Sequence, residues 1–405
     1  MQGRTGRMDA MGSAIANRPR ILVLADQFTP SRLGGGPVTS LVNLVAALGD
    51  EFAFHVATLD RDLGEPAPYP GLPTDQWLDR GTHRVLYRPA ARLWRIATPG
   101  DPQAIAPDLV YLNSVFSPAT TLPYLLWRRL NRKAAPPAIL APRGGLADAA
   151  LAIKAWKKRP VLGLMQSLGA YQGLHWQATA AGERDQIVRH AAPPEDVLHL
   201  APNLAASAQV DVLHRQRAAG APLRIAFLGR IVPMKNLDYA LRLLAQAAVS
   251  ATFDIHGPSE DRAYEAECRR LAETLPPEVR VGWKGPVVPQ DVPQTLRDYD
   301  LLLSPSRGEN YGHVIAEALS VGTPVLISDQ TPWRGLAWRG AGFDLPLNAP
   351  QAFVEALRHL ASEDAEASAR RRQAAHAYWQ ARSGRDDAIA AHRRMFNAVL
   401  RLPAR

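Results

Sequence analysis

Residues 301–329, LLLSPSRGENYGHVIAEALSVGTPVLISD, constrain the fold of this chain more than any other stretch. The apolar run at 301–303 predicts a buried strand, and the spacing of apolar residues over 314–319 predicts a helix. Gly322 and Pro324 end that helix, and the apolar run that follows them predicts another strand. The loop between the first strand and the helix therefore opens onto a helix N-terminus. Free backbone N–H groups and the helix dipole favour a bound phosphate at such a terminus.

Two carboxylates lie around this predicted helix start. Glu309 is in the loop, and Glu317 follows it by eight residues, about one turn into the helix. A carboxylate accepts two hydrogen bonds, which suits the neighbouring hydroxyls of a ribose or of a sugar ring. The alternative interpretation makes Glu309 a solvated loop residue and Glu317 a partner for a nearby Arg.

The stretch GENYGHVIAEALSVGTPVLISD, with its Glu-x7-Glu pair, resembles the nucleotide-sugar site of retaining glycosyltransferases of family 4, which are group 1 glycosyltransferases. The resemblance implies that Glu309 contacts the donor sugar and that Glu317 contacts the ribose. It also implies the GT-B fold, an α/β architecture in which two Rossmann-like domains with parallel sheets face a central cleft. The same loop and helix start would supply further donor contacts, from Asn310, Tyr311, Gly312, His313 and Val314.

A second stretch, 223–236, carries the same resemblance. An apolar strand there is followed by Arg230 and Lys235, where family members place an Arg and a Lys on the donor diphosphate. A guanidinium forks across phosphate oxygens, whereas an ammonium acts as a compact charge. Because negative charge develops on the departing diphosphate, we assign catalytic roles to Arg230 and Lys235. The donor-sugar contact that the resemblance implies gives Glu309 a catalytic role as well. Two plain surface cations are the alternative.

The resemblance also places other strand ends near the donor. Gly257 and Pro258 follow the strand FDIH, and Lys284 lies in VRVGWKGPV, whose backbone meets the base in relatives. The Asp-x-Asp pairs at 60–62 and 298–300 offer metal ligands, but both lie at element boundaries, where Asp serves as a cap or turn residue. We therefore expect no metal, and no cofactor apart from the nucleotide-sugar substrate.

Glycines in the N-terminal half indicate a second ligand-facing loop. Gly35 and Gly36 precede Pro37, and a helix is predicted over 39–48 with the proline at its first position. Glycines before a helix start let a ligand approach the backbone closely. The resemblance places this loop against the donor phosphate or the acceptor, and a plain tight turn is the alternative.

Two strand ends in this half predict acceptor contacts. Asn113 follows the strand LVYL, and Arg143 and Gly144 follow the strand ILA. The carboxyl ends of strands in an open α/β sheet face its ligand. Many relatives carry Pro-His-Gly where this chain has Pro-Arg-Gly, so a role that needs an imidazole is in doubt. An Arg at position 143 instead favours an anionic group on the acceptor or donor.

The chain of 405 residues exceeds what one core usually holds, so two domains are expected. The final helix of the GT-B fold crosses back to the first domain. The predicted segments are a disordered tail 1–18, an N-terminal acceptor-side domain 19–204, a linker 205–222, a C-terminal nucleotide-sugar-binding domain 223–385 and a crossover helix 386–405.

Charge and composition bear on location. The net charge of +9 suggests an anionic partner, and residues 127–159 gather Trp, Arg and Lys. Such a belt suits an anionic membrane face or an ordinary helix surface, and both interpretations stay open.

No apolar run approaches the roughly 18 residues of a membrane span. The first residues lack the apolar core of a signal peptide, and the single cysteine, Cys268, fits a reducing compartment. We expect a cytoplasmic protein with peripheral contact at the inner membrane face.

The predicted reaction is the transfer of a hexosyl group, with retention, from a UDP- or GDP-sugar. The acceptor would be a saccharide or a polyprenyl-diphosphate-linked saccharide in bacterial surface polysaccharide biosynthesis. A phosphorylase of the same fold would need a Schiff-base lysine for its cofactor, and a sugar-nucleotide epimerase would need no acceptor. Only the net charge supports the alternative of a nucleic-acid-binding protein, because the sequence has no groove-reading motif. No nucleic-acid partner is therefore expected.

Overall fold

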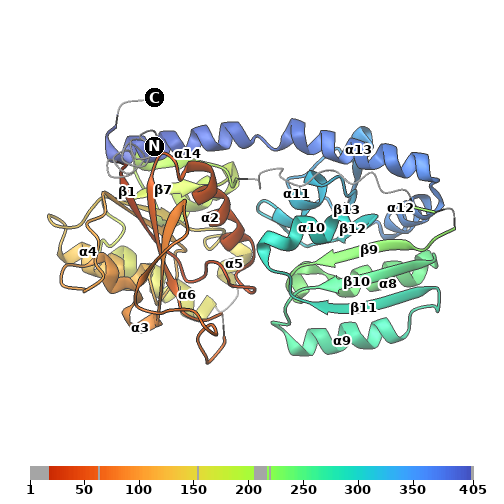
Figure 1. Ribbon diagram of the computed structural model, residues 1–405, viewed down its shortest axis with the longest axis horizontal. Helices are drawn as coiled ribbons and strands as arrows, with labels where there is room; N and C mark the ends of the chain where they lie inside the picture. Colours follow the sequence, from red (N-terminus) through yellow and green to blue (C-terminus); the bar gives the residue numbers. More distant parts are fainter. Residues whose placement is uncertain (1–17, 63, 153–154, 205–216, 219, 403–405) are drawn as a thin grey trace, which may run out of the picture. The chain divides into compact units, whose positions relative to one another are not determined.

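A computed structural model describes residues 18–62, 64–152, 155–204, 217–218 and 220–402 (Figure 1). The chain divides into two compact units. Unit 1 comprises Met1–Leu204 with Asp386–Arg405, and unit 2 comprises Ala205–Arg385. The predicted tail lies outside the described residues except for Arg18, as does most of the predicted linker. Each unit is an α/β structure built on its own largely parallel sheet.

The sheet of unit 1 has eight strands in the order β3-β4-β2-β1-β5-β6-β7-β8, and only β3 runs antiparallel to its neighbour. Short apolar runs form these strands, since both faces of a parallel sheet are buried. The strands are β1 (Arg20–Leu24), β2 (Ala53–Leu59), β3 (Trp77–Asp79), β4 (His83–Arg88), β5 (Leu109–Asn113), β6 (Ala138–Ala141), β7 (His175–Ala178) and β8 (Leu198–Leu200). The chain order reverses direction in the sheet between β1 and β5.

Helices cover both faces of this sheet. They are α2 (Gly35–Leu48), α3 (Ala90–Leu93), α4 (Thr121–Leu130), α5 (Asp148–Ala152), α6 (Ala155–Ser167), α7 (Ala181–Ala191) and α14 (Arg385–Leu400). The apolar face of α14, with Met395, Phe396 and Val399, joins the core beside α2. Phe396 packs against Phe52 and Phe54, so the end of the chain is part of unit 1.

The start of α2 corrects one prediction. The helix begins at Gly35 rather than near residue 39, so Gly35 and Gly36 lie in its first turn instead of preceding it. Gly35 has a φ of +54°, a conformation that glycine adopts without a steric cost. Pro37 is tolerated at the third position because the first four N–H groups of a helix have no partner within it.

The sheet of unit 2 has six parallel strands in the order β11-β10-β9-β12-β13-β14. The strands are β9 (Leu223–Leu228), β10 (Ala251–His256), β11 (Val279–Gly285), β12 (Leu301–Ser304), β13 (Val325–Ser328) and β14 (Gly342–Leu345). The helices are α8 (Leu237–Ala247), α9 (Arg262–Glu273), α10 (Val292–Arg297), α11 (His313–Ser320), α12 (Pro350–Ser362) and α13 (Ala365–Arg382). One core lies beneath α8, α9 and α12, and the other beneath α10, α11 and α13.

Candidate functional site

The strand order of unit 2 places its candidate site between β9 and β12. The chain order reverses direction there, and open α/β sheets bind ligands at such a point, outside the carboxyl ends of the strands. The loop after β9 leads to α8, and the loop after β12 leads to α11. Arg230 and Lys235 lie in the first loop and Glu309 in the second, so the structure brings the predicted cationic and acidic residues to one edge.

An ion pair joins the two loops. The Lys235 Nζ donates to Glu309 Oε1, and the exposed fractions of these side chains are only 18% and 12%. Two further contacts hold the loops together: the Arg307 N donates to the Met234 carbonyl at 2.9 Å, and Asn236 Nδ2 donates to the Pro305 carbonyl at 3.0 Å. The two predicted catalytic groups on either side of the switch point therefore meet directly.

Arg230 is also paired with a carboxylate. Its Nη1 lies 3.0 Å from Glu260 Oε2, and both side chains are partly exposed. Sequence reasoning did not include Glu260, because 30 residues separate it from Arg230. Both cations predicted to hold a diphosphate are thus neutralised by carboxylates, which an anionic ligand would have to replace.

The N-terminus of α11 depends on a glycine. Gly312 has a φ of +76°, and an added Cβ would lie 2.9 Å from Ile315 Cδ1. The helix then begins at His313, followed by Val314, so the first backbone N–H groups lie directly after this turn. Asn310 is exposed in the preceding loop.

Glu317 is the one predicted site residue whose environment is unusual for a carboxylate. Its side chain is buried within α11, and among the described residues no hydrogen bond or ion pair to its carboxylate is found. Burial raises the pKa of Glu317 to about 8. The expected alternative, a nearby Arg partner, is therefore wrong for the described part of the chain.

Tyr311 shares this environment. Its hydroxyl is buried and has no hydrogen-bond partner among the described residues, while its carbonyl accepts from Trp333 Nε1 at 2.6 Å. Burial, and after it the charge of Glu317, raises the pKa of Tyr311. Two neighbouring polar groups thus lack partners beside a helix start. Unsatisfied buried groups cost stability, so these two groups are candidates for ligand contacts.

Gly257 and Pro258 border the loop after β9. Gly257 has a φ of +151°, and an added Cβ would lie 1.8 Å from the Gly229 carbonyl oxygen, so only glycine fits. The Ile231 N donates to the Pro258 carbonyl at 2.9 Å. Lys284 lies elsewhere: it is on the face of β11, with its Nζ 3.6 Å from Asp254 Oδ1.

In unit 1 the predicted residues Asn113 and Arg143 form one cluster. The Arg143 Nε donates to Asn113 Oδ1 at 2.7 Å, Nη1 to Asn203 Oδ1 at 2.5 Å and Nη2 to the Tyr111 hydroxyl at 2.7 Å. All three acceptors are neutral, and no carboxylate in the described residues forms an ion pair with Arg143. The neighbouring Gly144 donates its N–H to Glu183 Oε1 at 2.6 Å.

This cluster extends to the last helix of the chain. The Tyr111 hydroxyl donates to Gln177 Oε1, and Gln177 Nε2 lies 3.1 Å from His392 Nε2 on α14. Burial, and to a smaller extent the charge of Arg143, lowers the pKa of His392 to about 4. The neutral ring donates through Nδ1 to the Ala388 carbonyl and accepts through Nε2. Sequence reasoning missed these supporting residues.

Both Asp-x-Asp pairs make contacts within the fold. Asp62 accepts from Ser31 Oγ at 2.7 Å and from the Arg32 N at 2.8 Å, so it holds the loop before α2. Asp300 Oδ2 accepts from the Arg224 N at 2.9 Å. In the part of the chain that the structure describes, no group of three or more His, Cys, Asp or Glu side chains is arranged to hold a metal ion.

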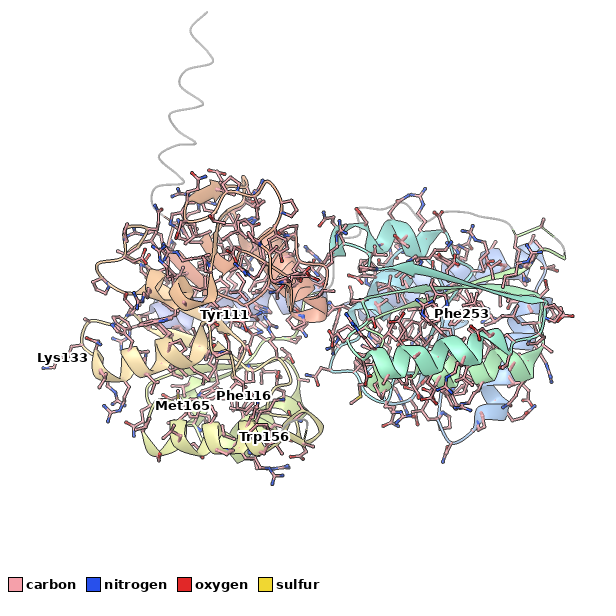
Figure 2. All side chains as sticks on the ribbon, turned by 90° about the horizontal axis from the view of Figure 1, so that it is seen from below. Tyr111, Phe116, Lys133, Trp156, Met165 and Phe253 are labelled. Carbon is pink, nitrogen blue, oxygen red and sulfur yellow. The ribbon has the colours of Figure 1, made fainter. Side chains whose placement is uncertain are left out.

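The basic and aromatic belt of 127–159 divides into two parts. Arg128, Arg129 and Arg132 donate to carbonyls of the turn at 168–173, so these cations are structural. Trp156 on α6 is 75% exposed, and the Lys157 Nζ lies 4.7 Å from the centroid of its ring (Figure 2).

Leucines extend this exposed part. Leu164 of α6 and Leu168, directly after the end of that helix, are exposed as well, and these two residues with Trp156 are here called the exposed α6 face. Lys154 lies outside the described residues. None of the helices described here is long and apolar enough to cross a membrane.

Comparison with known families shows what unit 2 resembles. The model of the family described as "Glycosyl transferases group 1" matches residues 212–378, which include both loops of the switch point. Most of unit 2 therefore resembles group 1 glycosyltransferases. A relative of this domain is the D-inositol 3-phosphate glycosyltransferase of Corynebacterium glutamicum (strain R), 29% identical over 164 residues. That match covers 37% of this chain and only 38% of the relative.

Solved structures show that the chain has the GT-B fold. The sucrose-phosphate synthase of Thermosynechococcus elongatus matches with a TM-score of 0.68 at 15% identity, covering 95% of this chain and all of that one. Anabaena HepE in complex with UDP-glucose matches with a TM-score of 0.59 at 16% identity and the same coverage. The predicted architecture of two Rossmann-like units is confirmed, with the unit that resembles group 1 glycosyltransferases as the second of them.

Proposed function

We propose that this chain is a retaining glycosyltransferase of the family 4 type that moves a hexosyl group from a UDP-sugar. The observation that carries the proposal is Glu317, a buried carboxylate of α11 that has no hydrogen bond or ion pair with the described residues. A ribose diol would supply two hydrogen-bond donors to it. UDP is favoured over GDP because HepE, which shares the fold, was solved with UDP-glucose.

The proposed mechanism opens the two ion pairs at the switch point. A bound diphosphate would take Lys235 from Glu309 and Arg230 from Glu260, since it carries more negative charge than a single carboxylate. The released Glu309 would then contact the donor sugar. As the glycosidic bond breaks, the two cations and the N-terminus of α11 stabilise the charge that develops on the leaving diphosphate. We propose that this electrostatic assistance acts on one face of the sugar and needs no metal.

Arg143 carries the proposal for the acceptor. It is held at three nitrogens by neutral groups and lacks a carboxylate partner in the described residues. A guanidinium fixed in this way is already oriented to bind an anionic group. We propose a saccharide acceptor bearing a phosphate or a carboxylate, for example a polyprenyl-diphosphate-linked saccharide of a bacterial surface polysaccharide. The exposed α6 face would then contact anionic lipid at the inner face of the cytoplasmic membrane.

Thermal-shift screening of the whole chain tests the donor. UDP and UDP-sugars should raise the melting temperature, and GDP should raise it less. NMR of the product formed from the UDP-sugar that binds should show the anomeric configuration of the donor. Inversion would contradict the family 4 assignment, and the absence of stabilisation by either nucleotide would contradict the donor site.

A further inference from the structure

Two strands of unit 2 alternate between apolar and polar residues although they belong to a parallel sheet. In β10, Phe253 and Ile255 join the core beneath α8 and α9, whereas Thr252 and Asp254 alternate with them. Strands of parallel sheets are usually apolar throughout, because helices cover both faces. The alternation therefore marks a face of β10 and β11 that lies outside both apolar cores of unit 2.

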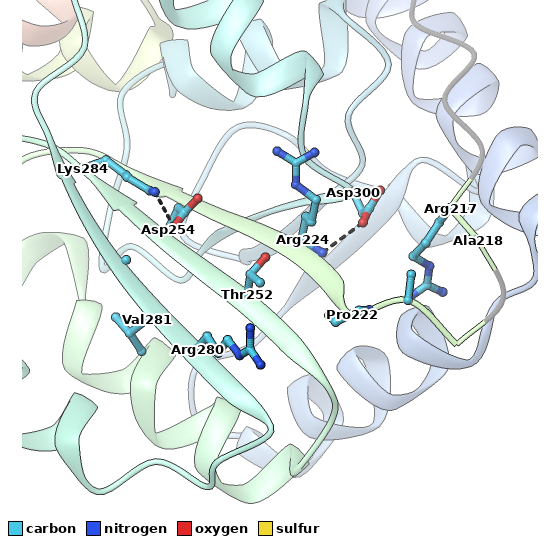
Figure 3. Close-up of a pocket in the computed structure, with 12 residues that line it drawn as sticks. Arg217, Ala218, Pro222, Arg224, Thr252, Asp254, Arg280, Val281, Lys284 and Asp300 are labelled. Carbon is cyan, nitrogen blue, oxygen red and sulfur yellow. Dashed lines mark hydrogen bonds and ion pairs between the residues drawn. The ribbon is translucent and has the colours of Figure 1, made fainter.

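A pocket of about 620 Å³ lies on this face (Figure 3). The strand register aligns Arg224, Thr252 and Arg280 in one row, with Thr252 between the two arginines. Asp254 and Gly282 form the next row. An added Cβ at Gly282 would lie 2.2 Å from Asp254 Oδ1, so the glycine keeps this part of the pocket open.

Several charged groups that line the pocket are already engaged. The Lys284 Nζ lies 3.6 Å from Asp254 Oδ1, and Asp254 Oδ2 accepts from the Tyr299 hydroxyl at 2.9 Å. Arg217 is buried, and its Nη2 donates to carbonyls at the end of α12. Arg217 thereby satisfies carbonyls that a helix end leaves without partners.

Arg224 and Arg280 differ from these groups. In the described part of the chain, neither guanidinium forms an ion pair. Arg224 lies 5.4 Å from the centroid of the Tyr299 ring, and Arg280 is exposed. With four cations and two carboxylates among its lining residues, the pocket has an excess of positive charge. Two forked guanidinium groups on either side of a hydroxyl are well suited to phosphate oxygens.

We propose that this pocket binds a phosphomonoester carried on a sugar or similar polyol. A phosphomonoester has a charge of about −1.5 to −2 at neutral pH, which matches the two arginines that form no ion pair with the described residues. The pocket has the size of a small-molecule site, which is larger than phosphate alone requires. Thr252, Asp254 and Asp300 provide oxygen atoms that accept hydrogen bonds from sugar hydroxyls.

This site is separate from the donor edge of the same sheet. Arg224, Thr252 and Arg280 are the second residues of their strands and lie at the amino ends. Arg230 and Lys235 follow the carboxyl end of β9. The proposal therefore does not depend on the proposed glycosyl transfer.

Calorimetry on the whole chain tests the site, with glucose 6-phosphate, glucose and inorganic phosphate as probes. The titrations are made in the presence of excess UDP, so that a phosphate site at the donor edge is filled. Glucose 6-phosphate should bind more tightly than inorganic phosphate, and glucose should not bind. Arg280→Gln should weaken glucose 6-phosphate binding at least about tenfold, because one charged hydrogen-bonding group is lost. This residue is exposed, so the variant should fold.

Two matched variants distinguish this pocket from the general surface charge and from the donor edge. Arg270→Gln removes the same charge from the exposed surface of α9 and should leave binding unchanged. Arg230→Gln, made at the donor edge and measured without UDP, should also leave it unchanged. Absence of glucose 6-phosphate binding, or equal losses in Arg270→Gln and Arg280→Gln, would overturn the proposal. Equal affinity for glucose 6-phosphate and inorganic phosphate would overturn the sugar part of it. Loss of binding only in Arg230→Gln would place the ligand at the donor edge.

Discussion

The candidate sites of the two units differ in how their charges are balanced. In unit 1 a guanidinium, that of Arg143, is held by three neutral groups and has no carboxylate partner in the described residues. In unit 2 the cations Lys235 and Arg230 are each paired with a glutamate, while the carboxylate of Glu317 is alone among the described residues. Under the proposed function, the Arg143 guanidinium of unit 1 would bind an anion directly. In unit 2, Glu317 would accept from hydroxyls, and Lys235 and Arg230 would leave their glutamates when a diphosphate binds.

The largest expected effect concerns the paired cations of unit 2. Lys235→Ala and Arg230→Ala should each lower kcat by about 10²–10³-fold, with a smaller change in KM, because their charge is used most as the leaving group departs. Arg242→Ala is a matched control, since it breaks one ion pair within α8 and one between α8 and α9, and neither involves the predicted site residues. Steady-state kinetics with and without EDTA is the measurement. Near-normal turnover in both variants, or wild-type activity lost in EDTA and restored by Mg²⁺ or Mn²⁺, would contradict this role.

The stability of unit 2 should fall as the pH rises. The ordinary pKa of a Glu is 4.5 and that of Glu317 is about 8, so between these values the folded chain keeps a proton that the unfolded chain has lost. Raising the pH over this range therefore costs about 1.4 kcal/mol of stability per unit. Glu317→Gln should remove this loss. Urea unfolding of both proteins at pH 5 and pH 8 measures it, and an unchanged pH dependence in the variant would show that Glu317 is not buried alone.

Unit 1 should show the opposite pH dependence, with a smaller effect. The ordinary pKa of a His is 6.5 and that of His392 is about 4, so below pH 6.5 the unfolded chain binds a proton that the folded chain does not. Acid therefore destabilises the fold between these values. His392→Gln should reduce the loss of stability between pH 7 and pH 5, whereas His359→Gln, at an exposed position of unit 2, should not. If both substitutions changed the loss of stability between pH 7 and pH 5 equally in urea unfolding, a lowered pKa of His392 would be contradicted.

The weakest expected effect is at the membrane. Trp156→Ala should reduce sedimentation with anionic vesicles at low salt, because an exposed Trp beside cations favours the interface. Trp338→Ala is a matched control, since Trp338 is 94% exposed in unit 2. High salt should weaken the association further. No sedimentation of the wild type at low salt would leave the exposed α6 face as ordinary surface.

The sequence predicted the strand–loop–helix unit of 301–329 because its parts are adjacent in the chain. Strand, loop, helix and next strand occupy 301–329, so the order of residues alone placed Glu309 and Glu317 around a helix start. The pairing of Glu309 with Lys235 spans 74 residues, and nothing local indicates it. The isolation of Glu317 depends on packing from both sides of α11, which a sequence pattern does not report.

The hydrogen-bond partners of Arg143 were harder still to predict. Its partners Asn113 and Asn203 are 30 and 60 residues away, and His392 lies 215 residues from Gln177. Those contacts exist only because β5, β6 and β7 are neighbours and α14 packs on them. The start of α2 was misplaced for a different reason. A proline signals the first turn of a helix without fixing the position in that turn.

Calorimetric titration of UDP into the wild type, Glu317→Ala and Glu309→Ala tests the central claim most directly. The account predicts that Glu317→Ala weakens UDP binding by about 10–100-fold, because two hydrogen bonds to the ribose are lost. Glu309→Ala should bind UDP about as well as the wild type, since the proposed contact of Glu309 is with the sugar and not with the nucleotide, and its loss should lower turnover instead. Equal losses of UDP affinity in the two variants, or unchanged affinity in Glu317→Ala, would contradict the account.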